Sequence, residues 1–211
     1  MSDRTDVVKR LLEQAGTSYA DEAGITLKNT PKPLFQLLVL CMLASKPIDA
    51  GIAVEAAREL FTAGLRTPDA VLRADRKTMI DAFGRASYAR YDESSAPRLT
   101  DIAAMVKDKY GGDLRRLAVT AHCDVAAAAK LLQEFNGIGQ TGADIYLREV
   151  QDTWTWVRPY FDDRARDAAR ALGLPTDDRE LGRLAVGKSA KVAAALVRVS
   201  LDEKILDAVA S

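Results

Sequence analysis

The stretch that decides the fold is FNGIGQTGA, residues 135–143. Its glycines, Gly137, Gly139 and Gly142, have the spacing G-x-G-x-x-G. In a dinucleotide-binding turn this spacing follows a β-strand and belongs to a parallel sheet. Here the preceding residues, AAAAKLLQE at 126–134, are among the most helix-favouring in the chain. The context therefore rules against a dinucleotide-binding turn.

A helix on each side of this turn makes a hairpin of two helices. We expect the first helix over residues 125–135 and the second over 141–150, with Gly137 and Gly139 permitting positive φ and the close approach of another backbone. Amides at the start of the second helix would point outward and could hold a phosphate without reading sequence. An ordinary helix–helix corner with glycine at its cap has the same spacing. Both interpretations stay open on local grounds.

The rest of the chain predicts an all-α protein. Of its 211 residues 48% are hydrophobic and only 6% aromatic, and no stretch alternates with the period of a strand. The run from Leu34 to Ala44 is apolar almost all round, which predicts a helix at the centre of the core. Further helices are expected over about 6–15, 50–63, 99–110, 163–172 and 189–199, with short helix starts at Thr67 and Asp75.

Charge and cysteine content limit the classes of function. Lysine plus arginine equals aspartate plus glutamate at 30 each, so any DNA site must be a local basic patch. The two cysteines, Cys41 and Cys123, form neither a CxxC pair nor an iron–sulfur cluster set, and we interpret them as buried or incidental thiols. Residues 1–13 lack an apolar signal core, and no apolar run is long enough to cross a bilayer. The sequence predicts a cytoplasmic protein without a membrane partner.

Three motifs, in order, resemble the helix-hairpin-helix (HhH-GPD) superfamily of DNA glycosylases, in particular its endonuclease III-like branch. The hairpin 135–143 resembles L-P-G-V-G-R-K-T-A of that family. FDDRAR at 161–166, followed by LGL at 172–174, resembles V-D-T-H-V-x-R ending in R-L-G and places the family's aspartate at Asp162. LASKPID at 43–49 resembles L-S-A-Q-x-T-D, with Lys46 where a glutamine fills the gap left by a flipped base. The resemblance spans roughly residues 33–174.

This resemblance implies a two-domain helical fold and a double-stranded DNA partner that is damaged or mismatched. A helical barrel of residues 30–150 would carry the hairpin at about 125–150, and residues 1–29 with 151–211 would form the second domain. The resemblance also implies that the hairpin can hold a monovalent cation through backbone carbonyls, and, for a bacterial protein, association with the nucleoid. The expected DNA-binding residues are Gly137, Ile138, Gly139, Gln140, Thr141, Gly142 and Lys46.

The departures from the family pattern bear on the chemistry. Thr141 stands where bifunctional members have the lysine that forms a Schiff base, and a hydroxyl cannot form an imine. We therefore expect a monofunctional glycosylase that hydrolyses the N-glycosidic bond with Asp162 as its catalytic carboxylate, without a cofactor or an iron–sulfur cluster. Aspartate before a helix is also a common N-cap. The alternatives are a non-catalytic DNA-binding paralogue, which Thr141, Lys46 and the zero net charge favour, and a helical protein–protein module.

Overall fold

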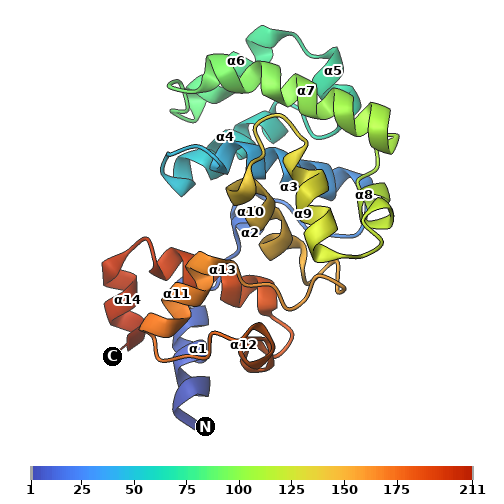
Figure 1. The fold of residues 1–211 in the computed structure, drawn as a ribbon. Helices are drawn as coiled ribbons and strands as arrows, with labels where there is room; N and C mark the ends of the chain where they lie inside the picture. The colour runs from blue at the N-terminus through green and yellow to red at the C-terminus, as the bar shows by residue number, and fades with distance from the viewer. Residues whose placement is uncertain (1, 211) are drawn as a thin grey trace. The chain divides into compact units, whose positions relative to one another are not determined.

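The computed structural model describes residues 2–210, and within that range every regular element is a helix (Figure 1). The all-α class predicted from the sequence is confirmed. The chain divides into two compact units. One, the hairpin unit, comprises Ala20–Tyr146, and the other, the terminal unit, comprises the residues up to Tyr19 together with those from Leu147 onward.

The hairpin unit is built around one buried helix. Helix α3 (Pro31–Ala44) has ten consecutive buried residues, from Leu34 to Leu43, because it is apolar on all sides, as the sequence predicts. It packs against α4 and α7. The helices of this unit are α2 (Tyr19–Glu22), α3, α4 (Ala50–Thr62), α5 (Pro68–Arg73), α6 (Arg76–Arg85), α7 (Asp92–Tyr110), α8 (Arg115–Thr120), α9 (Val125–Gln133) and α10 (Gln140–Val150), with the unit boundary falling inside α10.

Side-chain caps fix several helix starts in this unit. Thr67 Oγ1 accepts a hydrogen bond from the Ala70 amide at 3.2 Å, and Asp75 Oδ1 accepts one from the Thr78 amide at 2.7 Å, so both predicted starts are confirmed. Helix α7 begins at Asp92, seven residues before the predicted start at 99, and it contains Pro97. The proline lies near the beginning of the helix, where its missing N–H costs a single hydrogen bond.

The terminal unit has a core assembled from both ends of the chain. Helix α1 packs against α13 and α14, and Arg10 Nε donates to the Val209 carbonyl at 3.0 Å. Helix α13 supplies nine buried residues and also contacts α11. The helices are α1 (Ser2–Ala15), α11 (Asp163–Ala171), α12 (Asp178–Ala185), α13 (Ser189–Val199) and α14 (Glu203–Ala210); α12 was not predicted from the sequence.

Candidate functional site

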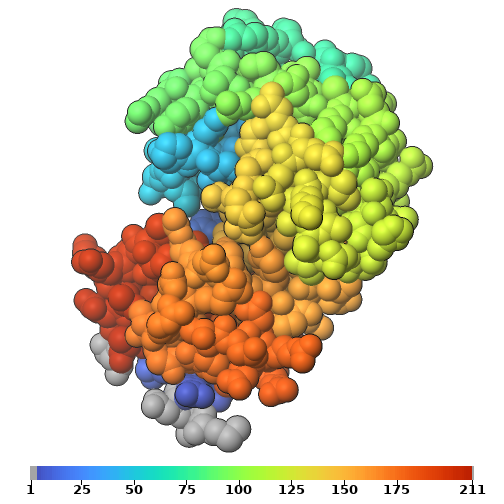
Figure 2. All heavy atoms as spheres, in the orientation of Figure 1, coloured from blue at the N-terminus to red at the C-terminus, as the bar shows by residue number. Residues whose placement is uncertain are grey.

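The hairpin has the helix–turn–helix geometry that the sequence predicts. Asp124 caps α9 by accepting from the Ala127 amide at 2.7 Å, and α10 starts when the Ala143 amide donates to the Gly139 carbonyl at 3.0 Å. Ile138 is buried and its amide donates to the Phe135 carbonyl at 3.0 Å. The turn, drawn in yellow, reaches the surface of its unit (Figure 2). Burial leaves only the backbone of Ile138 available to a ligand.

The three hairpin glycines serve different purposes. Gly137 has φ +89°, a conformation that favours glycine, whereas Gly139 does not have positive φ, so that part of the sequence prediction is wrong. A Cβ at Gly142 would lie 2.5 Å from Ser45 Oγ, so glycine here allows α10 to pack against the end of α3. A Cβ at Gly139 would meet nothing within 4 Å. No contact within the hairpin unit requires glycine at position 139.

A shallow hollow of about 490 Å³ lies along the hairpin. It is lined by residues 133–141 and by Ser45 at the end of α3. The amides of Gln140, Thr141 and Gly142 lie in the first turn of α10, where they have no partner within the helix. Together with the helix dipole, amides so placed form an anion-binding site. The Thr141 side chain is exposed beside them.

Arg98, which was not predicted from the sequence, lies against the turn. Its Cδ is 3.0 Å from where a Cβ of Gly137 would be, and in the range 2–210 no carboxylate pairs with it. Its position on α7 gives no local signal of this contact, because α7 and the hairpin meet only in the folded chain. The structure thus adds a guanidinium to the hairpin residues predicted from the sequence.

Lys46 and Arg90 both lie over the ring of Tyr91. The distances to the ring centroid are 5.9 Å from Lys46 Nζ and 5.4 Å from Arg90 Cζ. Lys46 follows Ser45, which lines the hairpin hollow. A partly exposed aromatic ring carrying two cations is suited to phosphate contact and base stacking. The sequence predicted a DNA-binding role for Lys46, which stays a prediction, and gave no role to Arg90.

Each carboxylate near the hairpin has a polar partner. Asp101 accepts from Asn136 Nδ2 at 2.7 Å, and Asp144 accepts from Gln140 Nε2 at 2.8 Å. Glu134 forms an ion pair with Lys109. Because Gln140 Oε1 also accepts from Gln133 Nε2 at 3.3 Å, the Gln140 side chain is engaged at both ends, and its backbone amide is the group left for a ligand.

Asp162 lies in the terminal unit, where it has two partners. One carboxylate oxygen, Oδ1, caps α11 by accepting from the Ala165 amide at 2.9 Å, and the other, Oδ2, pairs with Arg148 Nη1. Asp162 is only 9% exposed and Arg148 only 3%. The N-cap role that the sequence left open for Asp162 is confirmed. The Arg148 partner was not foreseen, because it depends on how residues fourteen apart in sequence meet in the fold.

The chain around this ion pair is firmly held. Gln151 is fully buried and exchanges two hydrogen bonds of 2.9 Å with the backbone of Tyr160, and its Nε2 also donates to the Arg148 carbonyl at 3.0 Å. Two guanidinium groups lie over the Tyr19 ring, with Arg148 Cζ at 5.9 Å and Arg198 Cζ at 4.2 Å from its centroid. The neighbouring Asp163, in contrast, has a side chain that is 95% exposed.

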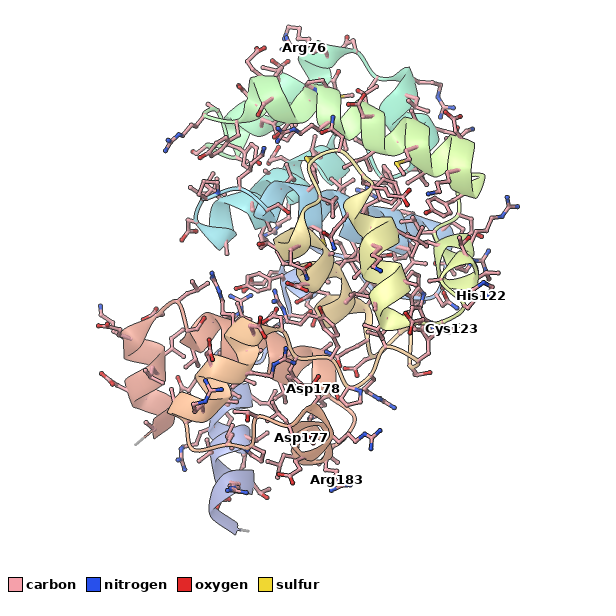
Figure 3. All side chains as sticks on the ribbon, viewed as in Figure 1. Arg76, His122, Cys123, Asp177, Asp178 and Arg183 are labelled. Atoms are coloured by element: carbon pink, nitrogen blue, oxygen red, sulfur yellow. The ribbon has the colours of Figure 1, made fainter. Side chains whose placement is uncertain are left out.

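The remaining candidates do not form a site. Cys41 is buried in α3, whereas Cys123 is exposed, next to the exposed His122 at the turn between α8 and α9 (Figure 3). Within residues 2–210, no three histidine, cysteine, aspartate or glutamate side chains gather as a metal site would require. No helix in that range has the length and apolar character needed to span a bilayer.

Comparison with known proteins identifies the fold through a solved structure. No family model matches the sequence, and neither does any curated protein. Among solved structures, the chain is similar to a trapped covalent intermediate of endonuclease III with DNA, in an estranged-adenine complex. The sequences are 16% identical, the TM-score is 0.53, and the match covers 93% of this chain and 82% of the other. The protein therefore has the all-α, helix-hairpin-helix fold of endonuclease III.

Proposed function

We propose that this protein binds duplex DNA through the hairpin, as a base-excision-repair protein that engages damaged or mismatched sites, and that binding without glycosidic hydrolysis is its activity. Gly139 carries the binding part of the proposal. Glycine at this exposed position satisfies no requirement of the surrounding chain, yet it leaves the first amides of α10 open to a phosphate. A DNA backbone approaching the turn would need that space.

The cations around the hairpin support the same function. Arg98 lies at Gly137, and Lys46 with Arg90 lies over Tyr91 near the end of α3. Phosphate contacts of this kind supply sequence-independent affinity and set the register of the protein on the duplex. Because the formal net charge of the chain is zero, DNA affinity would have to come from cations placed locally, as these three are.

The test compares two glycine substitutions. Gly139→Ala should weaken duplex binding by at least about tenfold, because one charge-assisted hydrogen bond contributes roughly 1.5 kcal/mol. Gly84→Ala, in α6, is the matched control, since a Cβ there also meets nothing within 4 Å. Gly139→Ala should keep the native melting temperature, and Gly84→Ala, which lies inside a helix, should keep or slightly raise it. Equal affinity of the native protein and both variants would rule out the hairpin as the binding site.

The surroundings of Asp162 favour DNA binding without hydrolysis of the glycosidic bond. A glycosylase carboxylate stabilises positive charge on the sugar or deprotonates a water molecule, and it needs an available oxygen and an uncancelled negative charge. Here one oxygen caps α11, and the other is paired with a buried guanidinium. The positive charge of Arg148 offsets the negative charge of Asp162, which therefore stabilises positive charge on a nearby sugar less.

Monofunctional hydrolysis is the second candidate. Asp162 begins α11 and is held rigidly there, and it occupies the position at which the resemblance places the catalytic aspartate. If DNA binding moved Arg148 away, the carboxylate could act on a water molecule. Thr141 still could not attack the sugar to form an imine, so any cleavage would need later alkali to break the strand.

Single-turnover excision separates the two candidates. The substrates are duplexes carrying uracil, alkylated, oxidised or mismatched bases, with abasic sites revealed by alkali. We expect salt-sensitive binding and no abasic sites from the native protein. Alkali-labile sites that vanish in Asp162→Asn, which keeps a capping oxygen, but persist in the neighbouring exposed control Asp163→Asn would establish the glycosylase instead.

A further inference from the structure

A second hollow lies in the hairpin unit, at the beginning of α3. Its volume is about 460 Å³, within the range of sites for small molecules. Three segments line it: the loop after α2, the first turns of α3, and the end of α4 with the turn that follows. The lining residues that matter here are Thr30, Lys32, Gln36, Arg58 and Arg66.

The charge of this hollow is positive. Lys32, Arg58 and Arg66 line it, and no carboxylate does. Arg58 has a loose ion pair with Glu55 at 3.6 Å, and Arg66 uses Nε to donate to the Phe61 carbonyl at 2.6 Å, which leaves its terminal nitrogens for a ligand. Three cations that line one hollow repel one another, and an anion between them would relieve that repulsion. The hollow is therefore suited to an anionic ligand.

Gln36 adds a polar group inside the hollow. It is 7% exposed and lies among the apolar residues of α3, yet within residues 2–210 its amide has no hydrogen-bond partner. The amide is not closed off from solvent, because Gln36 lines the hollow, so it can exchange water for a ligand there. A ligand in the hollow would supply that partner.

The start of α3 leaves further groups available. Pro31 and Pro33 have no N–H, so Lys32 provides the one backbone donor in the first three positions of the helix. Thr30 is the N-cap residue, but its side chain makes no capping hydrogen bond. The hydroxyl of Thr30 and the amide of Lys32 thus remain free for a ligand.

We propose that this hollow binds the phosphate group of a small molecule. Lys32, Arg58 and Arg66 surround the phosphate charge, and Gln36 hydrogen-bonds to an oxygen at the inner end. Gln36 is too deeply buried for a straight duplex to reach, which favours a compact ligand over the DNA backbone. The site uses none of the hairpin residues, so the proposal does not depend on DNA binding.

Titration of the full-length protein with inorganic phosphate and pyrophosphate tests this proposal. Calorimetry at constant ionic strength should show saturable binding that chloride does not reproduce. Lys32→Ala should weaken it by about tenfold, as expected for one lost charge-assisted contact. Lys28→Ala is the control, because Lys28 is an exposed lysine four residues before Lys32 that does not line the hollow. Gln36→Leu should weaken binding without lowering the melting temperature of the free protein.

Three results would overturn the proposal. The first is the absence of saturable phosphate binding, and the second is an equal loss in Lys28→Ala and Lys32→Ala. The third is displacement of bound phosphate by a short duplex, which would assign the hollow to nucleic acid instead of a small molecule. Gly139→Ala should leave phosphate binding intact, so failure of this site and failure of the hairpin proposal are told apart.

Discussion

Arg148 and Asp162 show at the residue scale how a motif and its surroundings can favour different functions. The motif places a carboxylate where catalysis is expected, whereas the fold pairs that carboxylate with a buried guanidinium. Such a pair adds little net stability, because desolvation largely offsets the attraction between the charges. Removing one partner is costly, since the other charge is then buried alone.

Asp162→Ala should therefore destabilise the protein strongly. It removes the cap of α11 and strands the charge of Arg148, and we expect the free energy of unfolding to fall by about 3–5 kcal/mol. Asp162→Asn should cost less, because it retains a capping oxygen. Urea unfolding measures both. If Asp162→Ala were no more destabilising than Asp163→Ala, the ion pair would not persist in solution.

Buried tyrosines should make stability fall at alkaline pH. Burial raises the pKa of Tyr88 above its ordinary value of 10.0 and raises the pKa of Tyr146 well above it. The unfolded chain then loses phenolic protons first as the pH rises, so the stability present below pH 10.0 is lost above it. Each tyrosine contributes a slope of up to about 1.4 kcal/mol per pH unit.

Replacing these tyrosines tests that cause. Tyr146→Phe and Tyr88→Phe should each flatten the fall in the free energy of unfolding between about pH 9 and 11. Urea unfolding across that range measures the slope. Parallel curves for the native protein and both variants would mean that other groups govern the alkaline limit.

At the scale of elements, the sequence predicts those helices whose position depends on residues close in sequence, through apolar composition or a capping side chain. The helix from Leu34 to Ala44 follows from its uniformly apolar composition, and the starts after Thr67 and Asp75 follow from their caps. The start of α7 was placed too late, and α12 was missed although Asp177 caps it. Residues 92–98 of α7 carry no large apolar side chain, and α12 buries only Leu181 and Ala185, so the apolar pattern marks neither start.

The same distinction applies to the candidate site. The hairpin turn and the position of Asp162 follow from residues close in sequence. Arg98 at Gly137 and Arg148 at Asp162 do not, since each is brought to its partner by the packing of a different helix or by a loop. The sequence therefore predicted the hairpin turn and the cap at Asp162, but not the guanidinium that pairs with that carboxylate.

The cap of α9 should support the hairpin. Asp124→Ala removes the acceptor for the Ala127 amide and should lower the free energy of unfolding by about 1 kcal/mol. Asp124→Asn keeps an acceptor and should stay near the native value. Circular dichroism with urea unfolding measures the difference. Identical losses in both variants would show that the charge of Asp124, and not its capping bond, is what matters.

At the scale of the whole molecule, the number of phosphates that the protein contacts sets how strongly DNA binding depends on salt. Three cations lie at the proposed interface, Arg98, Lys46 and Arg90, so the slope of log K against log salt concentration should be about −3, from roughly −0.9 per phosphate. Arg98→Ala should make the slope shallower by about one. Binding measured by fluorescence anisotropy over a salt series gives both values, and a slope near zero would contradict the phosphate contacts.

Helix α1 belongs to a core whose other helices are encoded on the far side of the hairpin unit. During synthesis α1 emerges before the hairpin unit, but α13 and α14 follow only after all of that unit has been translated. At about 5–20 residues per second, that interval is on the order of ten seconds, during which the apolar face of α1 has no partner. The hairpin unit, which is continuous in sequence, can fold meanwhile. The terminal unit is thus the first of the two to enter synthesis and the last to complete its fold.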